Sequence, residues 1–366
     1  SFPTRRSSDL PVRWWNDEVL FSAAFETADA AGTALRIAGA TCYRIEVNGK
    51  FLGFGPARGP LGFDREETWP LKDVARSGTN TIDIQVASYR DNNYSFVNQS
   101  PFLWAEVVDG RGRVLCATGR DFTARRTGRN CNAGKFTFQR PMREERTLGA
   151  EEISKQEVHR SAMDNEVKVV QVAPRPRLDR RVPLPTFEIE GMKMERPSRS
   201  DGQSGGKNSN SLFSLSRNET GFIGAKVTCE SPATVRLTFD EMLTNGEVNP
   251  GRFYQGGDVI WHFAKAGTYD VETFDPYTLK YARFETTEGS AKVTDAFLRR
   301  YENPMVGYRP RTTGDAELDR IREAAVASFA QNTVDVMTDC PSRERAGWLC
   351  DSFFTARAAQ HLLGGH

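Results

Sequence analysis

Several features that mark common protein classes are scarce or missing in this sequence of 366 residues. It has only four histidines, and none of its six cysteines lies in a Cys-x-x-Cys pair, which argues against a zinc knuckle. No apolar run approaches the roughly 18 residues that a membrane-spanning helix needs. Lys plus Arg total 49 against 48 Asp plus Glu, so the basic excess typical of nucleic-acid-binding proteins is absent. We therefore expect no bound metal, cofactor, nucleic acid or membrane span.

The cysteines and both ends of the chain add little to this picture. Scattered cysteines are typical of buried free thiols, and they do not identify a redox compartment. The chain opens without Met, and Phe2–Leu10 looks like a translated sequencing adapter, with a genuine polar leader as the alternative. It stops just after a helical pattern, so we expect an internal piece of a longer protein. Localisation and oligomeric state stay open.

What the sequence does contain is a long series of short strands separated by turn signals. Cys42–Val47 alternates apolar and polar residues, Asn48-Gly49 is a strong hairpin signal, and Phe51–Phe54 returns as the partner strand. Thr81–Ala87 alternates again. Regularly spaced strands of this kind predict a jelly-roll-like β-sandwich.

A second β-rich stretch follows a less regular region. Gly224–Cys229 and Thr234–Phe239 alternate well, Asn245-Gly246 supplies a turn, and Ala291–Leu298 completes a second predicted sandwich. The intervening region holds a basic run between residues 125 and 146. Glutamates accompany the run, so we interpret it as a mixed-charge surface and not as a nucleic-acid patch.

The pattern becomes helical near Pro310. Leu318, Ile321 and Phe329 recur at helical spacing, Asp315 suits the first turn, and Ser352–Leu363 predicts a second helix. The resulting division is an artefact in 1–10, a β-sandwich in 11–123, a linker and irregular β region in 124–211, a second sandwich in 212–303, and the start of a helical domain in 304–366.

The segment between the two predicted helices carries the chemistry. It runs Thr338-Asp-Cys-Pro-Ser-Arg-Glu-Arg-Ala-Gly-Trp-Leu-Cys-Asp351, and Pro341 and Gly347 prevent one continuous helix. Carboxylates that accept from hydroxyls, an arginine fork and an indole face are the groups that a sugar site needs. The alternative is an ordinary charged loop in which Asp351 caps the second helix and the arginines pair with Glu344.

This string resembles the bacterial α-L-rhamnosidases, family 78 of the glycoside hydrolases. Their members carry an Asp-Cys-Pro-x-Arg run, an acidic-arginine pair and Gly-Trp-x-x-Asp between the first two helices of an (α/α)6 toroid. Other stretches resemble the same family's preceding domains and first helix: Val47–Lys50, Gly53–Pro60, Gly221-Phe222, Leu237–Glu241, Tyr281–Phe284 and Gly314–Leu318. Cys350 and Ala346 depart from the family pattern, in which Gly and Leu are usual.

The resemblance implies a fold and a mechanism. The fold is multidomain, with two all-β sandwiches followed by the first helices of an incomplete (α/α)6 toroid. The family hydrolyses with inversion, and Glu344 matches its general acid. Asp339, Arg343, Trp348 and Asp351 match residues that hold the terminal rhamnose of a glycoside or polysaccharide. The general base belongs to a later helix of the family and is absent from this chain, so we expect the 366 residues alone to be inactive.

Arg343 and Arg345 flank Glu344, and nearby positive charge favours an ionised carboxyl, which does not suit an acid. We therefore expect these arginines to point toward the two aspartates and leave Glu344 desolvated.

Two other functions remain possible from the sequence. One is a glycosidase on the same toroid that acts on another sugar. The other is a non-catalytic carbohydrate-binding β-sandwich protein whose platform is formed by aromatic side chains, for which the candidates are Trp14, Trp15, Tyr94, Phe96 and Trp104. Such aromatics more often belong to the core of a sandwich.

Overall fold

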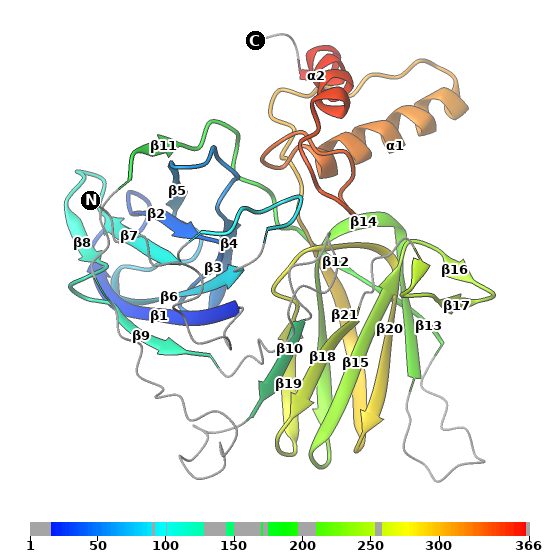
Figure 1. Cartoon of the computed structure of the whole chain (residues 1–366), viewed down its shortest axis with the longest axis horizontal. Helices are drawn as coiled ribbons and strands as arrows, with labels where there is room; N and C mark the ends of the chain where they lie inside the picture. Colours follow the sequence, from blue (N-terminus) through cyan, green and yellow to red (C-terminus); the bar gives the residue numbers. More distant parts are fainter. Residues whose placement is uncertain are drawn as a thin grey trace.

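The computed structural model describes residues 16–89, 92–99, 101–127, 144–149, 170, 175–196, 210–252 and 258–363. Two β-sandwiches lie side by side, and two helices lie beyond them at the C-terminal end of the chain (Figure 1). This arrangement confirms the expected fold class of β domains followed by the start of a helical domain. The expected artefact at residues 1–10, Trp14, Trp15 and most of the basic run lie outside the described residues.

The first sandwich pairs two five-stranded sheets. One has the order β4-β3-β6-β1-β9 and the other the order β11-β5-β2-β7-β8. Between them lies a core of buried side chains that includes Leu35, Ile45 and Trp69. The strands are β1 (Asn16–Thr27), β2 (Ala34–Ala40), β3 (Cys42–Val47), β4 (Lys50–Gly55), β5 (Asp64–Pro70), β6 (Gly78–Tyr89), β7 (Phe102–Val108), β8 (Val114–Ala117), β9 (Thr123–Arg126) and β11 (Arg177–Asp179).

The predicted hairpin of this sandwich is confirmed. β3 begins and ends at the residues expected from alternation, and it pairs with β4 through Asn48-Gly49. Both turn residues have positive φ, 52° and 71°, which Asn and Gly tolerate at low cost. The loops that follow β4 and β6 lead toward the helical end of the molecule.

The second sandwich is one nine-stranded sheet that folds over on itself through β14 (Asn210–Cys229). The first half of β14 pairs with β13 and β20, and the second half pairs with β19 and β21. The other strands of this sheet are β10 (Glu144–Leu148), β12 (Ile189–Gly191), β13 (Lys193–Arg196), β15 (Ala233–Asp240), β18 (Asp258–Phe263), β19 (Gly267–Glu272), β20 (Tyr277–Glu288) and β21 (Ala291–Arg300). β16 (Leu243–Thr244) and β17 (Glu247–Val248) form a separate two-stranded sheet.

The described parts of 124–211 contribute strands to both sandwiches. β10 pairs with β18 of the second sandwich, whereas β11 pairs with β5 of the first. The two sandwiches also share a cluster of aromatic side chains, which we call the junction cluster. It contains Phe54, Tyr89, Phe222 and Phe274, with Phe51, Phe96, Phe187 and Tyr301 packed against them. The sandwiches are therefore joined by an apolar interface as well as by the chain.

The helices are α1 (Ala316–Asn332) and α2 (Leu349–Leu363). Asp315 caps α1, because its carboxylate accepts from the amides of Glu317 and Leu318. α2 begins three residues before Ser352, where the helical spacing predicted its start. Within the described part of the chain, no helix is long and apolar enough to cross a membrane.

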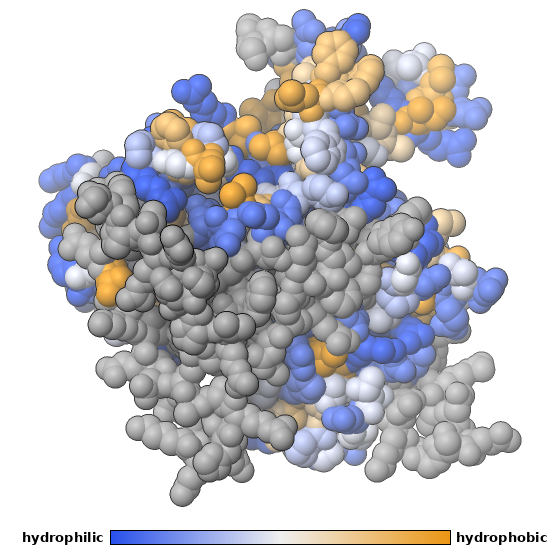
Figure 2. Space-filling model, in the orientation of Figure 1, coloured by the Kyte–Doolittle hydropathy of each residue, from blue (hydrophilic) through white to orange (hydrophobic). Residues whose placement is uncertain are grey.

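The end of α1 is attached to the second sandwich through a buried side chain. Gln331 is buried and bonds to the Thr220 hydroxyl and the Glu219 carboxylate of β14, at 2.8 and 2.9 Å. Apolar residues gather on the outer surface of both helices (Figure 2). The large ones are Leu318, Ile321, Leu349, Phe353 and Phe354, all more than half exposed.

The cysteines divide into two groups. Cys42, Cys116 and Cys229 are buried free thiols, as expected. Cys340 is half-buried and Cys350 is exposed, so the expectation is wrong for these two. Both lie in or beside the α1–α2 loop, where the surface is open.

Candidate active site

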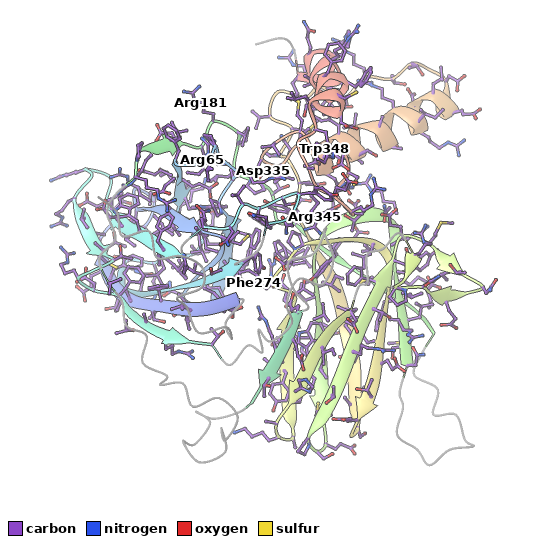
Figure 3. The ribbon with its side chains drawn as sticks, in the orientation of Figure 1. Arg65, Arg181, Phe274, Asp335, Arg345 and Trp348 are labelled. Carbon is purple, nitrogen blue, oxygen red and sulfur yellow. The ribbon has the colours of Figure 1, made fainter. Side chains whose placement is uncertain are left out.

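The predicted site residues lie in the loop between α1 and α2 and in the first turn of α2. We call residues 333–348 the acid loop, because it contains Glu344. Figure 3 shows Asp335, Arg345 and Trp348 of this loop beside the first sandwich, above the second. The carbonyl of Asn332 accepts from the Thr338 amide at 2.9 Å, which folds the start of the loop back onto the end of α1.

Glu344 lies between two of the residues predicted to accompany it. Its Oε2 accepts a 2.7 Å hydrogen bond from Nε1 of Trp348, and its Oε1 lies 3.6 Å from Nη2 of Arg343. The indole is 46% exposed, and its only N–H is engaged by Glu344, so the ring face remains available. The three side chains thus form one group on the open side of the loop.

Asp339 has a different set of contacts. Its Oδ1 accepts from the Ala346 amide at 2.9 Å, and its own amide donates to the Ala346 carbonyl at 3.0 Å. The thiol of Cys340 lies 3.0 Å from Oδ2. In this structure the carboxylate therefore closes the acid loop from inside.

Asp351 lies in the first turn of α2 and is exposed. With the residues that the structure describes, its side chain forms no hydrogen bond or ion pair. The alternative in which Asp351 caps α2 is wrong, because the helix already begins at Leu349. Cys350, at the position where the family pattern has Gly, is exposed on the same turn.

The expected placement of the two arginines is also wrong. Arg343 lies beside Glu344 itself, and Glu344 keeps 23% of its side chain exposed instead of being desolvated. Arg345 donates to the carbonyls of Pro341 and Pro276. The physical reason is that Asp339 already accepts from the backbone of the loop, so its carboxylate competes poorly for a guanidinium.

The first sandwich binds the acid loop through Arg58, in the loop after β4. The guanidinium of Arg58 holds both oxygens of Asp335, with Nε 2.7 Å from Oδ2 and Nη2 2.6 Å from Oδ1. Its backbone amide donates to the same Oδ2 at 3.0 Å, and Nη1 donates to the carbonyl of Arg345. This fork joins two points of the loop, ten residues apart, to one side chain.

Burial and the contact with Arg58 act in opposite directions on the pKa of Asp335. Burial alone raises the pKa of a carboxyl group, but the charge and hydrogen bonds of Arg58 outweigh burial and lower the pKa of Asp335 to about 2. The pair is therefore ionised at neutral pH.

A second contact comes from the loop after β6. The Ser95 hydroxyl donates to the carbonyl of Glu344 at 3.1 Å and lies 3.4 Å from that of Arg345. The ring of Tyr94 meets the ring of Trp348 edge to face, with centroids 5.7 Å apart. The first sandwich thus contacts the backbone of Glu344 and the indole that bonds its side chain.

Three of the aromatics considered as a sugar platform are among the described residues, and of these three Tyr94 lies at this site. Phe96 packs against Tyr89 in the junction cluster. Trp104 has the Arg177 guanidinium 3.6 Å from its ring centroid, which covers that face. The prediction that these three residues together form a sugar platform is therefore wrong.

Beneath the loop lies a pocket of about 60 Å³, lined among others by Arg58, Thr220, Tyr301, Asp335 and Arg345. This volume holds about two water molecules and is far below the several hundred Å³ of a typical ligand pocket. No cluster of three or more His, Cys, Asp or Glu within the described ranges is arranged to hold a metal ion. The group around Glu344 instead faces open space.

Sequence reasoning missed Arg58, Asp335 and Ser95. Arg58 belongs to the Gly53–Pro60 stretch that carried part of the resemblance, but nothing indicated its partner. Asp335 stands between Val334 and Val336. A charged residue between apolar neighbours is the signal from which a buried ion pair could have been predicted.

Comparisons with known proteins match the segment that contains the acid loop. Residues 311–366, which include the acid loop, match the family model described as the bacterial alpha-L-rhamnosidase 6 hairpin glycosidase domain. No curated protein sequence matches the chain.

Solved structures of α-L-rhamnosidases share the fold of almost the whole chain. The GH78 family rhamnosidase of Bacillus sp. GL1 aligns over 96% of this chain and 60% of its own, with a TM-score of 0.75 and 13% identity. The α-L-rhamnosidase from Dictyoglumus thermophilum aligns over 94% and 39%, with a TM-score of 0.67 and 17% identity. That of Streptomyces avermitilis, solved with L-rhamnose, aligns over 92% and 33%, with a TM-score of 0.61 and 18% identity.

The chain therefore spans between a third and three fifths of the length of these three structures. Together with the family-model match, they confirm the resemblance to the bacterial α-L-rhamnosidases that the 339–351 string carries.

Proposed function

We propose that this chain is the front part of an inverting glycoside hydrolase that releases terminal α-L-rhamnose from rhamnosides or rhamnose-containing polysaccharides. The observation that carries the proposal is the placement of Glu344 against Trp348 and Arg343, on the open side of a loop within the segment that matches the rhamnosidase family model.

Glu344 acts as the general acid in this proposal. It donates a proton to the glycosidic oxygen as the bond from that oxygen to the anomeric carbon breaks. The Trp348 N–H fixes the orientation of the carboxyl group through Oε2. The half-exposed indole then offers its face to the apolar side of the sugar ring, and Tyr94 supports the indole from behind.

The other predicted residues hold the terminal rhamnose. Asp351 is exposed and accepts from sugar hydroxyls, and Arg343 donates to them. Asp339 belongs to the same set, although in this structure its Oδ1 closes the loop. L-Rhamnose bound to the Streptomyces avermitilis enzyme supports this sugar as the ligand class.

The second half of the reaction needs a general base that activates water on the opposite face of the sugar. In inverting enzymes the two carboxyl groups stand roughly 6.5–9.5 Å apart to admit that water. We place the base outside these 366 residues, and we propose that the chain alone does not hydrolyse glycosides. Its span of 33–60% of the matched rhamnosidases supports this placement.

The test is Glu344→Gln in the full-length protein that carries this chain, with Glu323→Gln on the exposed surface of α1 as the matched control. On an aryl α-L-rhamnoside with a poor leaving group we expect kcat to fall about 10²- to 10⁴-fold. On one with a strongly activated leaving group the loss is far smaller, because that group departs without a proton. Unchanged activity on both substrates contradicts the assignment of the acid.

The sugar is tested separately with a panel of aryl glycosides on the wild-type protein. Preference for α-L-rhamnoside supports the proposal, whereas preference for another sugar selects the alternative of a related toroidal glycosidase. Turnover by the 366-residue chain alone contradicts the placement of the base.

A further inference from the structure

Two loops of the first sandwich bind the backbone at the point where the acid is attached. Ser95 donates to the carbonyl of Glu344, and Arg58 donates to the carbonyl of Arg345. Ser95 also lies 3.4 Å from the second carbonyl. Two consecutive peptide units of the acid loop are therefore held by a domain that lies more than 200 residues earlier in the chain.

The backbone at this point has a conformation that needs support. Arg345 has a φ of +54°, in the left-handed region that residues other than glycine rarely adopt. Such a conformation persists only when surrounding contacts determine it. The Asp339–Ala346 bonds close the loop on one side, and the contacts from the first sandwich hold the carbonyls on the other.

The Arg58 contact is the stronger of the two because it is built from a fork. The guanidinium binds Asp335 through Nε and Nη2, and its remaining nitrogen, Nη1, reaches Arg345. Asp335 is only 9% exposed and Arg58 22% exposed, so water competes weakly with these bonds. A lysine presents one ammonium point charge and no planar fork, so it does not reproduce the two-point contact with Asp335 together with the bond to the Arg345 carbonyl.

We propose that Arg58 is a positioning residue for Glu344, acting through the ion pair with Asp335 and the carbonyl of Arg345. The proposal rests on the proposed function, in which Glu344 is the general acid. It makes the first sandwich part of the catalytic machinery, because that domain sets where the acid stands.

The first test needs no activity and uses the 366-residue chain. In Arg58→Lys we expect amide hydrogen exchange of the peptide 339–348 to become roughly tenfold faster or more, since the loop opens locally more often. The matched control is Arg252→Lys, which breaks another fork onto a buried aspartate, Asp240, with comparable exposure of 18% and 5%. The control leaves exchange of 339–348 unchanged. Wild-type exchange in Arg58→Lys overturns the proposal.

The second test uses the full-length protein and two aryl α-L-rhamnosides. In Arg58→Lys we expect kcat on the poor leaving group to fall about 10- to 100-fold, with KM within about twofold, because a small misplacement of a catalytic group is costly. The loss on the strongly activated leaving group is much smaller, since that substrate needs no acid. Equal losses on both substrates indicate general damage and overturn the positioning role.

Asp335→Asn provides the same tests if Arg58→Lys does not fold. It removes the charge that aligns the fork, so faster exchange and the same dependence on leaving group are expected.

Failure of the proposed function is recognised separately. If Glu344→Gln keeps full activity while Arg58→Lys speeds exchange, Arg58 holds the loop but positions no acid, and the proposal is overturned together with that assignment.

Discussion

Asp335 carries its negative charge in a buried position against Arg58. Burial opposes the charge, and the fork of Arg58 more than compensates, so that the pKa lies near 2. An unfolded aspartate has a pKa near 3.9. A carboxyl group whose pKa is lowered on folding stabilises the fold above its unfolded pKa, and this contribution disappears as the pH falls through the folded value.

The first prediction at this scale concerns acid stability. Between about pH 4 and pH 2, the wild-type chain loses roughly 2 kcal/mol of unfolding free energy through Asp335, whereas Asp335→Asn loses nothing by this route. Urea unfolding of both proteins at several pH values measures the difference. At pH 7 the variant is the less stable of the two, because Arg58 loses its partner. Parallel curves for the two proteins across this range contradict the prediction.

β14 is the element on which the second sandwich depends. It runs through 20 residues and changes partners at Gly221, which pairs with Tyr277 of β20 and with Arg300 of β21. A Cβ at Gly221 would lie 2.1 Å from the carbonyl oxygen of Arg299, a backbone atom that cannot rotate away. The close approach of three strands therefore requires glycine here.

The prediction at this scale is that Gly221→Ala destabilises the chain by about 3 kcal/mol, since overpacking against backbone is costly. Gly191→Ala in β12 is the matched control, because a Cβ there has no neighbour within 4 Å. Chemical denaturation of the three proteins gives the two differences. Equal effects of the two substitutions would show that the crowding at Gly221 is relieved by movement of β21.

The whole molecule is held together by the junction cluster. Phe222 is fully buried there, and its ring packs against those of Phe54, at 5.1 Å between centroids, and Tyr301, at 5.8 Å. Arg44 and Arg299 lie on Phe51 from the two sandwiches, 4.6 and 4.4 Å from its centroid. Tyr301 packs against this cluster and also lines the pocket beneath the acid loop. The placement of the acid loop therefore depends on how the sandwiches meet.

At the molecular scale we predict that Phe222→Ala lowers stability by about 3–5 kcal/mol and separates the unfolding of the two sandwiches. Phe213→Ala, an equally buried truncation inside the second sandwich, costs a similar amount but leaves the transitions coupled. Scanning calorimetry distinguishes one heat-absorption peak from two. A single peak in Phe222→Ala means that the remaining contacts between the two sandwiches suffice to couple their unfolding.

Sequence by itself determined much of the local structure and the resemblance that the acid loop carries. The alternation of Cys42–Val47 and the turn at Asn48-Gly49 appear as predicted, since each depends on neighbouring residues alone. Asp315, which was expected in the first turn of the helix, is its N-cap instead. The 339–351 string likewise carried the resemblance to the α-L-rhamnosidases, because its residues are contiguous, and the family-model match agrees with it. The roles of its side chains in binding and catalysis stay predictions.

Tertiary structure alone decided what surrounds that string. Arg58 and Asp335 are 277 positions apart, and no periodicity or motif connects residues at such a separation. Their contact exists because two loops of the first sandwich reach the end of α1, and this depends on the junction cluster and on the path of β14. The contacts of Arg343 and Arg345 were wrongly expected for the same reason: the competition between backbone amides and guanidinium groups for one carboxylate is settled by three-dimensional distances, which a sequence pattern does not contain.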